Sequence, residues 1–465
     1  MSDTAPAQPP RPQGDDHPLV RAGLLALAWP IFVEQALRVL IGTVDTFMVA
    51  HVGDDAVAGL GVANQFVTLA IILFNFVAVG ASVVITHHLG AGDRPGAERI
   101  GAAAVAVNTW FGLLVSAAMA GLAEPLLRLM QLEGRPLEYA LPFLLLMGGT
   151  LFVEARNVAQ AAVLRAHGHT RVAMLVTVGQ NVLNAAGNAL LLFGWFGLPR
   201  MGVVGVALSS VASRLLASAA LYVLVHHYTR IRPRLRDYFD LPRERLARIL
   251  HIGLPAAGEN LSWWLALMVV TSFVARMGGP ALATQTYTMQ VTTWVIQFSI
   301  SIGIGTELLV GHLVGAGEIE AAYRQLLRSL RTGILLALAV VTAVAVAAPR
   351  LLGLFTQDAV VIATGALLLR IGLVLEPGRV FNVVVINSLR ATGDVKFPVL
   401  VGLASMWGVW VPLAWLLGLK AGLGLTGVWI SMAADEWLRG LLMYRRWRQR
   451  RWVKYARRSR ARAAA

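Results

Sequence analysis

The sequence predicts an all-α integral membrane protein with twelve transmembrane helices, arranged as two pseudo-twofold-related six-helix bundles around a central cleft. Three observations lead to this fold class. Hydrophobic residues make up 57% of the 465 residues and charged residues only 14%, which is too few charges for a soluble domain. Twelve apolar stretches are long enough to cross a bilayer, and the two halves of the chain repeat each other.

The expected spans each exceed the roughly 20 residues that a transmembrane helix needs. They lie near residues 22–49, 56–86, 98–122, 138–162, 172–194, 202–226, 247–274, 281–312, 326–347, 361–387, 396–418 and 423–444.

Charge placement predicts the domain organisation and the orientation. The loops expected outside hold few basic residues, namely Arg128, Arg135, Arg200, Arg276, Arg350 and Lys420. The positive-inside rule then puts both termini in the cytoplasm of a multi-pass bacterial inner membrane protein. The expected units are a disordered cytoplasmic N-terminus (1–20), an N-lobe (21–228), a basic cytoplasmic linker (229–246), a C-lobe (247–444) and a basic cytoplasmic tail (445–465).

The basic balance and the missing cysteines exclude several classes. The formal net charge is +15, but ten Lys and Arg residues lie in the tail from Arg445, beyond the last apolar stretch. Such a tail is typical of anchoring at anionic lipid headgroups, so we expect the bilayer and no nucleic acid as a partner. Without cysteine there is no disulfide, Cys-ligated zinc, Fe–S cluster or thiol catalysis.

A constant offset of 225 residues relates the two halves. Rare residues keep this register, which chance apolar similarity does not explain. The matched positions include Pro30/Pro255, Glu34/Glu259, Gln65/Gln290, His87/His312, Asn157/Asn382 and Leu164-Arg165-Ala166/Leu389-Arg390-Ala391. A six-span repeat returns the chain to its starting side, so the halves have parallel topology and can enclose a cleft that opens to alternate sides.

Several motifs occur in a specific order. They are Val44-Asp45-Thr46, Leu183 to Asn188, Gly197 to Ser210, Val310 to Gly317 and Leu389 to Asp394. With these motifs the chain resembles the multidrug and toxic compound extrusion (MATE) family over about residues 20–440. The resemblance implies antiport of H⁺ or Na⁺ against small amphipathic, often cationic, organic compounds, without another cofactor.

The resemblance assigns ion coupling to the first half. Asp45 matches the family's first-helix aspartate, and Asn184 with Asn188 matches an Asn-x-x-x-Asp pair whose second member here is Asn. In the second half, Trp263 and Arg379 stand where members with a sodium site there carry acids. A carboxyl shielded from water can load and release a proton. The alternatives are a solvated acid at the rim for Asp45 and interhelical polar contacts for the asparagines.

The predicted substrate cleft combines residues of both halves. Glu34 and Glu259 follow the related prolines by four residues, where an organic cation could meet a carboxylate. Trp263 could stack on such a cation or simply pack against other helices. Glu34 also has the i,i+4 spacing of a salt bridge with Arg38. The full set is Glu34, Glu259, Asn260, Trp263, Gln65 and Gln290.

Other charges in the spans predict a buried network, because isolated charges in hydrocarbon are costly. We expect Glu307, Glu376 and Arg379 to form one set and Glu154 with Arg156 another, acting as structural or gating bridges alongside Arg38. Arg214 needs an acidic partner as well. His87, His88 and His312 fit packing or interfacial positions better than metal ligands.

The sequence therefore favours a monomeric, secondary active exporter that is not an enzyme. A flippase for a lipid-linked precursor is the nearest alternative, and it would want a strongly cationic cleft. The HExxH and GxSxG motifs of membrane-embedded hydrolases and the P-loop of ATP-driven pumps do not occur in the sequence.

Overall fold

The structure is a computed structural model that describes residues 18–194, 197, 199–231, 238–239 and 242–464. Throughout these described ranges the regular elements are helical and no strand occurs. The predicted all-α class is therefore confirmed.

The helices fall into two bundles joined along the chain. The N-terminal bundle contains α1 (Pro18–Val49), α2 (Asp54–Ala91), α3 (Arg94–Leu129), α4 (Gly134–Gly149), α5 (Leu151–Ala166), α6 (Thr170–Phe193) and α7 (Gly202–Thr229). The C-terminal bundle contains α9 (Arg243–Ala275), α10 (Gly279–Ala316), α11 (Ile319–Leu352), α12 (Ala359–Ala391), α13 (Lys396–Ser405), η3 (Met406–Trp410), α14 (Val411–Trp415), η4 (Leu416–Lys420) and α15 (Gly424–Arg448). A last helix, α16 (Val453–Ala464), follows this bundle.

A helix, or a helix with a break, covers each of the twelve expected spans. Among the described residues, eight helices are long and apolar enough to cross a membrane, and the pair α4 and α5, bent by 46°, raises this number to nine. The helices α6, α9 and α15 are less apolar because asparagines or charged side chains interrupt them. The number of twelve membrane spans thus stays a prediction.

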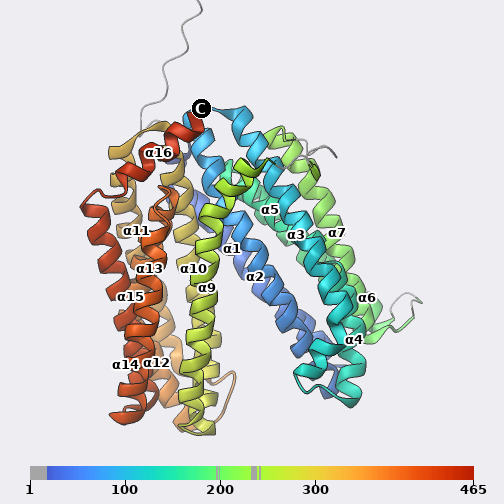
Figure 1. Cartoon of the computed structure of the whole chain (residues 1–465). Helices are drawn as coiled ribbons and strands as arrows, with labels where there is room; N and C mark the ends of the chain where they lie inside the picture. The colour runs from blue at the N-terminus through green and yellow to red at the C-terminus, as the bar shows by residue number, and fades with distance from the viewer. Residues whose placement is uncertain (1–17, 195–196, 198, 232–237, 240–241, 465) are drawn as a thin grey trace, which may run out of the picture.

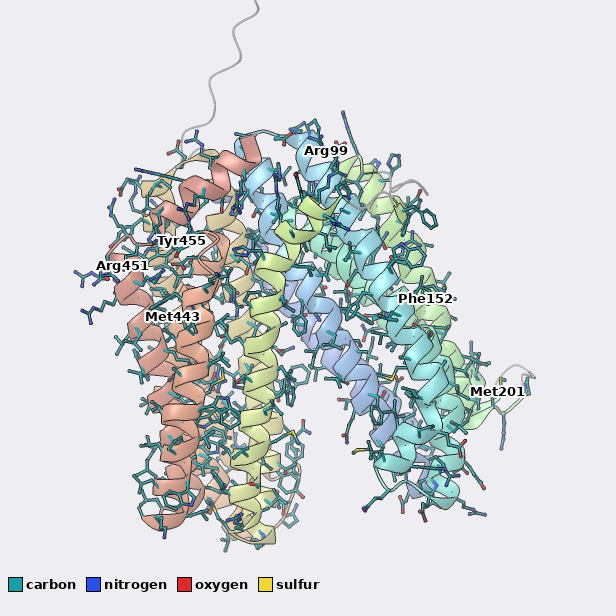
Figure 2. The ribbon with its side chains drawn as sticks, viewed as in Figure 1. Arg99, Phe152, Met201, Met443, Arg451 and Tyr455 are labelled. Carbon is teal, nitrogen blue, oxygen red and sulfur yellow. The ribbon has the colours of Figure 1, made fainter. Side chains whose placement is uncertain are left out.

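The two bundles lie close together at one end and diverge toward the other (Figure 1). The C-terminus and α16 lie at the converging end. Arg99, Arg451 and Tyr455 lie toward this end, whereas Met201 lies toward the diverging end (Figure 2).

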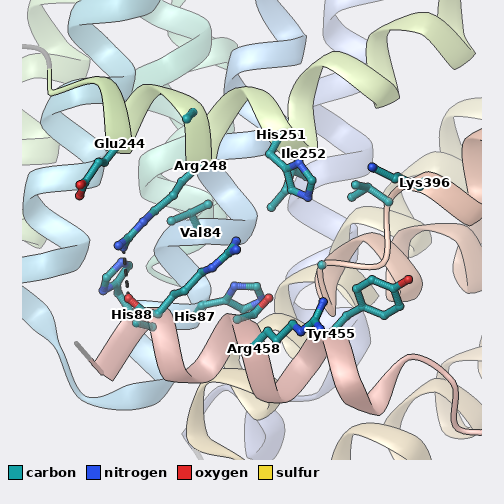
Figure 3. A pocket seen from close by; sticks show the side chains of 16 residues that line it. Val84, His87, His88, Glu244, Arg248, His251, Ile252, Lys396, Tyr455 and Arg458 are labelled. Atoms are coloured by element: carbon teal, nitrogen blue, oxygen red, sulfur yellow. Dashed lines mark hydrogen bonds between the residues drawn. The ribbon is translucent and has the colours of Figure 1, made fainter.

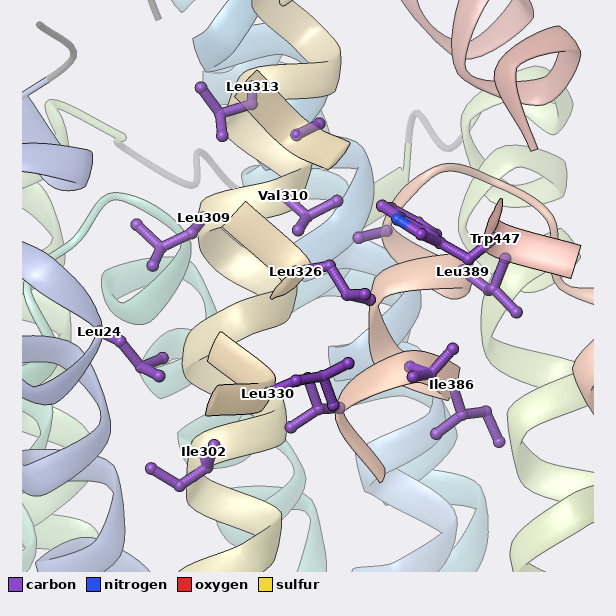
Figure 4. Close-up of a cluster of buried hydrophobic side chains, with 14 of the residues drawn as sticks. Leu24, Ile302, Leu309, Val310, Leu313, Leu326, Leu330, Ile386, Leu389 and Trp447 are labelled. Carbon is purple, nitrogen blue, oxygen red and sulfur yellow. The ribbon is translucent and has the colours of Figure 1, made fainter. Parts of the chain in front are cut away.

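One apolar core continues from the C-terminal bundle into α1. Leu24 of α1 packs in the same buried cluster as Ile302 and Val310 of α10, Leu330 of α11 and Trp447 of α15 (Figure 4). Helices in a bilayer gain stability from van der Waals packing rather than from removal of apolar surface from water. The N-terminal part of α1 is therefore held by the opposite bundle.

Glycines allow α2 and α10 to cross at backbone distance in the converging end. A Cβ atom on Gly90 would lie 2.1 Å from the carbonyl oxygen of His312, and one on Gly315 would lie 2.3 Å from that of His87. Neither position has room for a side chain, and Gly90 and Gly315 are 225 residues apart. The crossing is thus formed by a pair of repeat-related glycines, one from each half of the chain.

Two histidines join the bundles at the same place. His87 Nε2 donates a hydrogen bond to the Ala391 carbonyl of α12 at 2.6 Å, and His312 Nε2 donates to the Ala166 carbonyl of α5 at 2.9 Å. Donors and acceptors are both related by the offset of 225 residues. Each bundle therefore contributes one hydrogen-bond donor and one acceptor at the converging end.

Candidate functional site

The structure brings the three predicted ion-coupling residues together. Asp45 lies on α1, and Asn184 and Asn188 lie one turn apart on α6. Asn188 Nδ2 donates to Asp45 Oδ1 at 2.6 Å and lies 3.4 Å from Asn184 Oδ1. All three side chains are buried, and Asp45 is only 4% exposed.

Serines of α7 hold this group from the other side. Asn184 Nδ2 donates to Ser210 Oγ at 2.8 Å, and Ser209 Oγ donates to the backbone carbonyl of Asn184 at 2.9 Å. Ser210 also forms a side-chain hydrogen bond with Asp45. The carboxylate is therefore fixed by α6 and α7 together.

The donor and acceptor groups here are of the kind that a proton or a small monovalent cation can use. They include one carboxylate, the amide oxygens and a hydroxyl, and Asn188 Oδ1 is buried without a hydrogen-bond partner within the described structure. Arg214 is the cationic group whose charge acts on Asp45. A carboxylate beside an unused amide oxygen can take up a proton or help to hold a small cation.

A buried ion network ties α1 to α5 and α7. Glu34 bonds Arg165 Nη1 at 2.7 Å and Arg38 Nη2 at 3.2 Å. Glu154 bonds Arg38 Nη1 at 3.2 Å and Arg214 Nε at 3.5 Å. The predicted Glu34–Arg38 pair thus forms, and Arg214 finds the acid that it needs.

The predicted pairing of Glu154 with Arg156 is wrong. The Arg156 guanidinium lies over the Tyr222 ring, 5.4 Å from its centroid, while Glu154 faces Arg38. Residues two apart on a helix point to different sides, so this spacing does not favour a contact.

The C-terminal bundle has a matching network. Glu259 of α9 accepts from Arg390 Nη2 of α12 at 2.5 Å. Glu376 lies 3.1 Å from Arg379 Nε, as the sequence predicted, and Arg379 Nη1 lies 3.5 Å from Glu436 of α15.

Three further charged residues, on α15, were not predicted from the sequence. Arg439 Nη2 lies 2.8 Å from Asp435 and 3.3 Å from Glu436, and Ser405 donates a short hydrogen bond to Asp435. The signal was present, because acids at 435 and 436 followed by an arginine at 439 interrupt an expected span at i,i+3 and i,i+4 spacing.

The predicted place of Glu307 beside Glu376 and Arg379 is also wrong. Glu307 of α10 is buried where the charges of Arg390 and Arg165 act on it. These are the arginines that pair with the two repeat-related glutamates. Glu307 is thus associated with both of these pairs and not with the α15 network.

The residues predicted to line a substrate cleft separate into two groups. Glu34 and Glu259 are buried in their arginine pairs, so neither carboxylate is open to an organic cation in this conformation. Asn260, Gln65 and Gln290 are exposed, and Asn260 Nδ2 donates to the Ala256 carbonyl of its own helix.

Trp263 packs within the C-terminal bundle. Its ring stacks on Trp410 with centroids 6.5 Å apart and meets Trp264 edge-on at 5.3 Å. This arrangement favours the packing alternative for Trp263, while Trp264 is 45% exposed.

Comparisons with known proteins identify the family and the fold. The family model MatE matches residues 30–190 and 255–416, two segments that begin at the repeat-related Pro30 and Pro255. The "Uncharacterized transporter YisQ" of Bacillus subtilis is 42% identical over 92% of this chain and 94% of its own length. The "Probable multidrug resistance protein NorM" of Thermotoga maritima is 27% identical over 95% of both chains. A solved outward-facing MATE family transporter matches with a TM-score of 0.85 and 23% identity, over 93% of this chain and 96% of its own.

Proposed function

This chain belongs to the MatE family of membrane transporters, and from that premise we propose that it exports small amphipathic or cationic compounds in exchange for H⁺ or Na⁺. The observation that carries the proposal is the buried carboxylate of Asp45, held by Asn188 at 2.6 Å within an apolar span. An ionisable side chain at such depth is costly and marks an ion pathway. The family's members are transporters, and we assign this chain no catalytic step.

Coupling follows from the hydrogen bonds around Asp45. The ionised carboxylate accepts from the Asn188 amide, so loading with a proton removes its negative charge, adds an O–H donor and weakens the charge-assisted hydrogen bond that links α1 to α6. Sodium would instead be coordinated by the Asp45 carboxylate and by the Asn188 side-chain oxygen, which has no hydrogen-bond partner among the described residues. Either ion changes the interaction between α1 and α6, and α1 also packs on the C-terminal bundle through Leu24. Ion loading at Asp45 can therefore bias how the bundles meet.

We place the converging end in the cytoplasm, with both termini, because the basic tail lies there and basic segments stay inside. This conformation is then closed to the cytoplasm and diverges outward, with the transport path between the bundles. The chain would span the inner membrane twelve times and act as a monomer.

The test uses the purified protein in proteoliposomes with ethidium as the cationic dye. An imposed proton gradient should drive dye uptake, and Asp45→Asn should slow it at least about tenfold. The matched control is Asp55→Asn, the same change at an exposed position in the first turn of α2. A sodium gradient in the same vesicles identifies the coupling ion.

Each outcome is decisive. Full dye transport in Asp45→Asn would remove Asp45 from coupling. Failure of the wild-type protein to move dye under either gradient, with movement of a labelled lipid-linked precursor instead, would replace the exporter by the flippase alternative.

A further inference from the structure

A cavity of about 770 Å³ lies at the converging end, outside the Asp45 site. His87 and His88 of α2, Arg248 and His251 of α9, Lys396 of α13 and Arg458 of α16 line it (Figure 3). Elements of both bundles thus meet around one space, with α16 as one wall.

The lining is strongly basic. Four side chains that are always cationic at neutral pH face it, from Arg248, Lys396, Arg458 and Arg462, together with three histidines. Glu244 is the single acidic residue of the lining. The Tyr455 side chain adds a hydroxyl group that can donate a hydrogen bond.

These cations lack acidic partners within the part of the chain that the structure describes. Arg248 Nη1 donates to the backbone carbonyl of Arg462 at 3.1 Å, and no ion pair to a described carboxylate involves Arg248, Lys396, Arg458 or Arg462. In contrast, the neighbouring Arg446 and Arg450 are both paired, with Asp394 and Glu320. Like charges that face one concave space repel and raise the local affinity for anions.

We propose that this cavity binds a phosphate-bearing anion from the cytoplasmic side. Arginine guanidinium groups bind phosphate oxygens in a fork geometry, lysine adds a point charge, and the Tyr455 hydroxyl can add a hydrogen bond. The same chemistry is offered by the headgroup of an anionic phospholipid and by a free phosphate. Neither source is the compound that the transporter is proposed to export.

Binding there would stabilise the closed end. The anion would contact α2 of one bundle and α9, α13 and α16 beside the other, and α16 is itself tied to the α12 end because Ser459 Oγ donates to the Thr392 carbonyl at 3.3 Å. A ligand that contacts both bundles binds the state in which they meet more tightly than the state in which they separate. The cavity is thus an effector site that favours closure at this end.

The experiment compares thermal unfolding of the full-length protein in neutral detergent with chloride alone, with added inorganic phosphate, and with phosphatidylglycerol or phosphatidylcholine. The cavity variant is Arg458→Gln with Arg462→Gln. The matched control is Arg451→Gln with Arg457→Gln, which removes the same charge from exposed positions outside the lining.

At saturating ligand we expect the unfolding temperature of the wild type and of the control to rise by about 3 °C or more, and that of the cavity variant to rise by less than half as much. A rise with phosphatidylglycerol alone identifies a lipid headgroup, and a rise with inorganic phosphate as well identifies a free phosphate. No rise with either probe, or equal rises in the cavity variant and the control, overturns the proposal.

Discussion

Glu34 and Glu259 occupy equivalent places in the two bundles, and each is bonded by an arginine that lies 131 residues further along the chain. Arg165 reaches Glu34 at 2.7 Å and Arg390 reaches Glu259 at 2.5 Å. The internal repeat is therefore preserved in a specific buried contact, and not only in the order of the helices.

Breaking one of these pairs should cost stability, because it leaves an uncompensated arginine inside the protein. We expect Glu259→Gln to lower the free energy of unfolding by about 3 kcal/mol or more. The double variant Glu259→Gln with Arg390→Gln should lose less, since no arginine is left unpaired and Glu307 keeps the charge of Arg165. Glu320→Gln, which breaks an exposed pair with Arg450, should cause no measurable change. Thermal unfolding in detergent measures all three, and equal losses for Glu259→Gln and Glu320→Gln would contradict this interpretation.

A second carboxylate at position 188 should change the preferred coupling ion. Asn188→Asp replaces the amide donor that lies 2.6 Å from Asp45 Oδ1 by an acid. Two carboxylates this close either share a proton or attract a cation. Dye transport by this variant should depend more strongly on sodium than wild-type transport does, as measured by initial rates across a sodium titration at fixed pH. An unchanged sodium response would argue against a direct role of Asn188 at the ion.

A methyl group at the glycine crossing should force the converging end apart. Gly90→Ala puts a Cβ atom 2.1 Å from the His312 carbonyl oxygen, and overpacking of this kind costs about 1–3 kcal/mol. Gly61→Ala on the same helix meets nothing within 4 Å and serves as the control. The chain has no cysteine, so spin labels at Arg99→Cys and Arg451→Cys report the separation directly. We expect a longer label distance in Gly90→Ala only, and an unchanged distance would refute the role of this crossing.

The turn between α2 and α3 should be sensitive to acid. Partial burial alone would raise the pKa of Asp93, but hydrogen bonds from the Gly96 amide at 2.9 Å and from His88 at 2.8 Å lower it below the usual 3.8. Asp93 caps the N-terminus of α3 by accepting from the Gly96 amide. Because the folded-state pKa is the lower one, this cap contributes its full stability above about pH 4 and loses it as the pH falls further. Asp93→Ala should cost about 1 kcal/mol near neutral pH and progressively less as the pH falls below about 4, as thermal unfolding over this pH range will measure.

Two features of the sequence predicted the fold. They are the length of the apolar spans and a repeat that holds Pro30 and Pro255 in register. The sequence also predicted that Asp45 and Asn188 act together, because the resemblance placed them in one motif set. What it could not supply was the partner that each buried acid finds on another helix. Arg165 and Arg390 appeared in the repeat, but nothing in a linear sequence states that α5 and α12 face α1 and α9.

The two wrong charge sets have the same origin. Glu154 and Arg156 are neighbours in the sequence, and Glu307 and Glu376 are acids in different spans of the second half, whereas pairing inside a bundle is decided by which helix faces meet. The charges of α15 at Asp435 and Arg439 complete the second network, and helical spacing alone would have revealed them.

The exchanged hydrogen bonds of His87 and His312 make the closed end a self-complementary joint. Each bundle supplies one histidine donor and one alanine carbonyl acceptor. One of the two hydrogen bonds therefore cannot break while the other keeps its original geometry. The two bundles should therefore separate at this end in an all-or-none step and not by gradual widening.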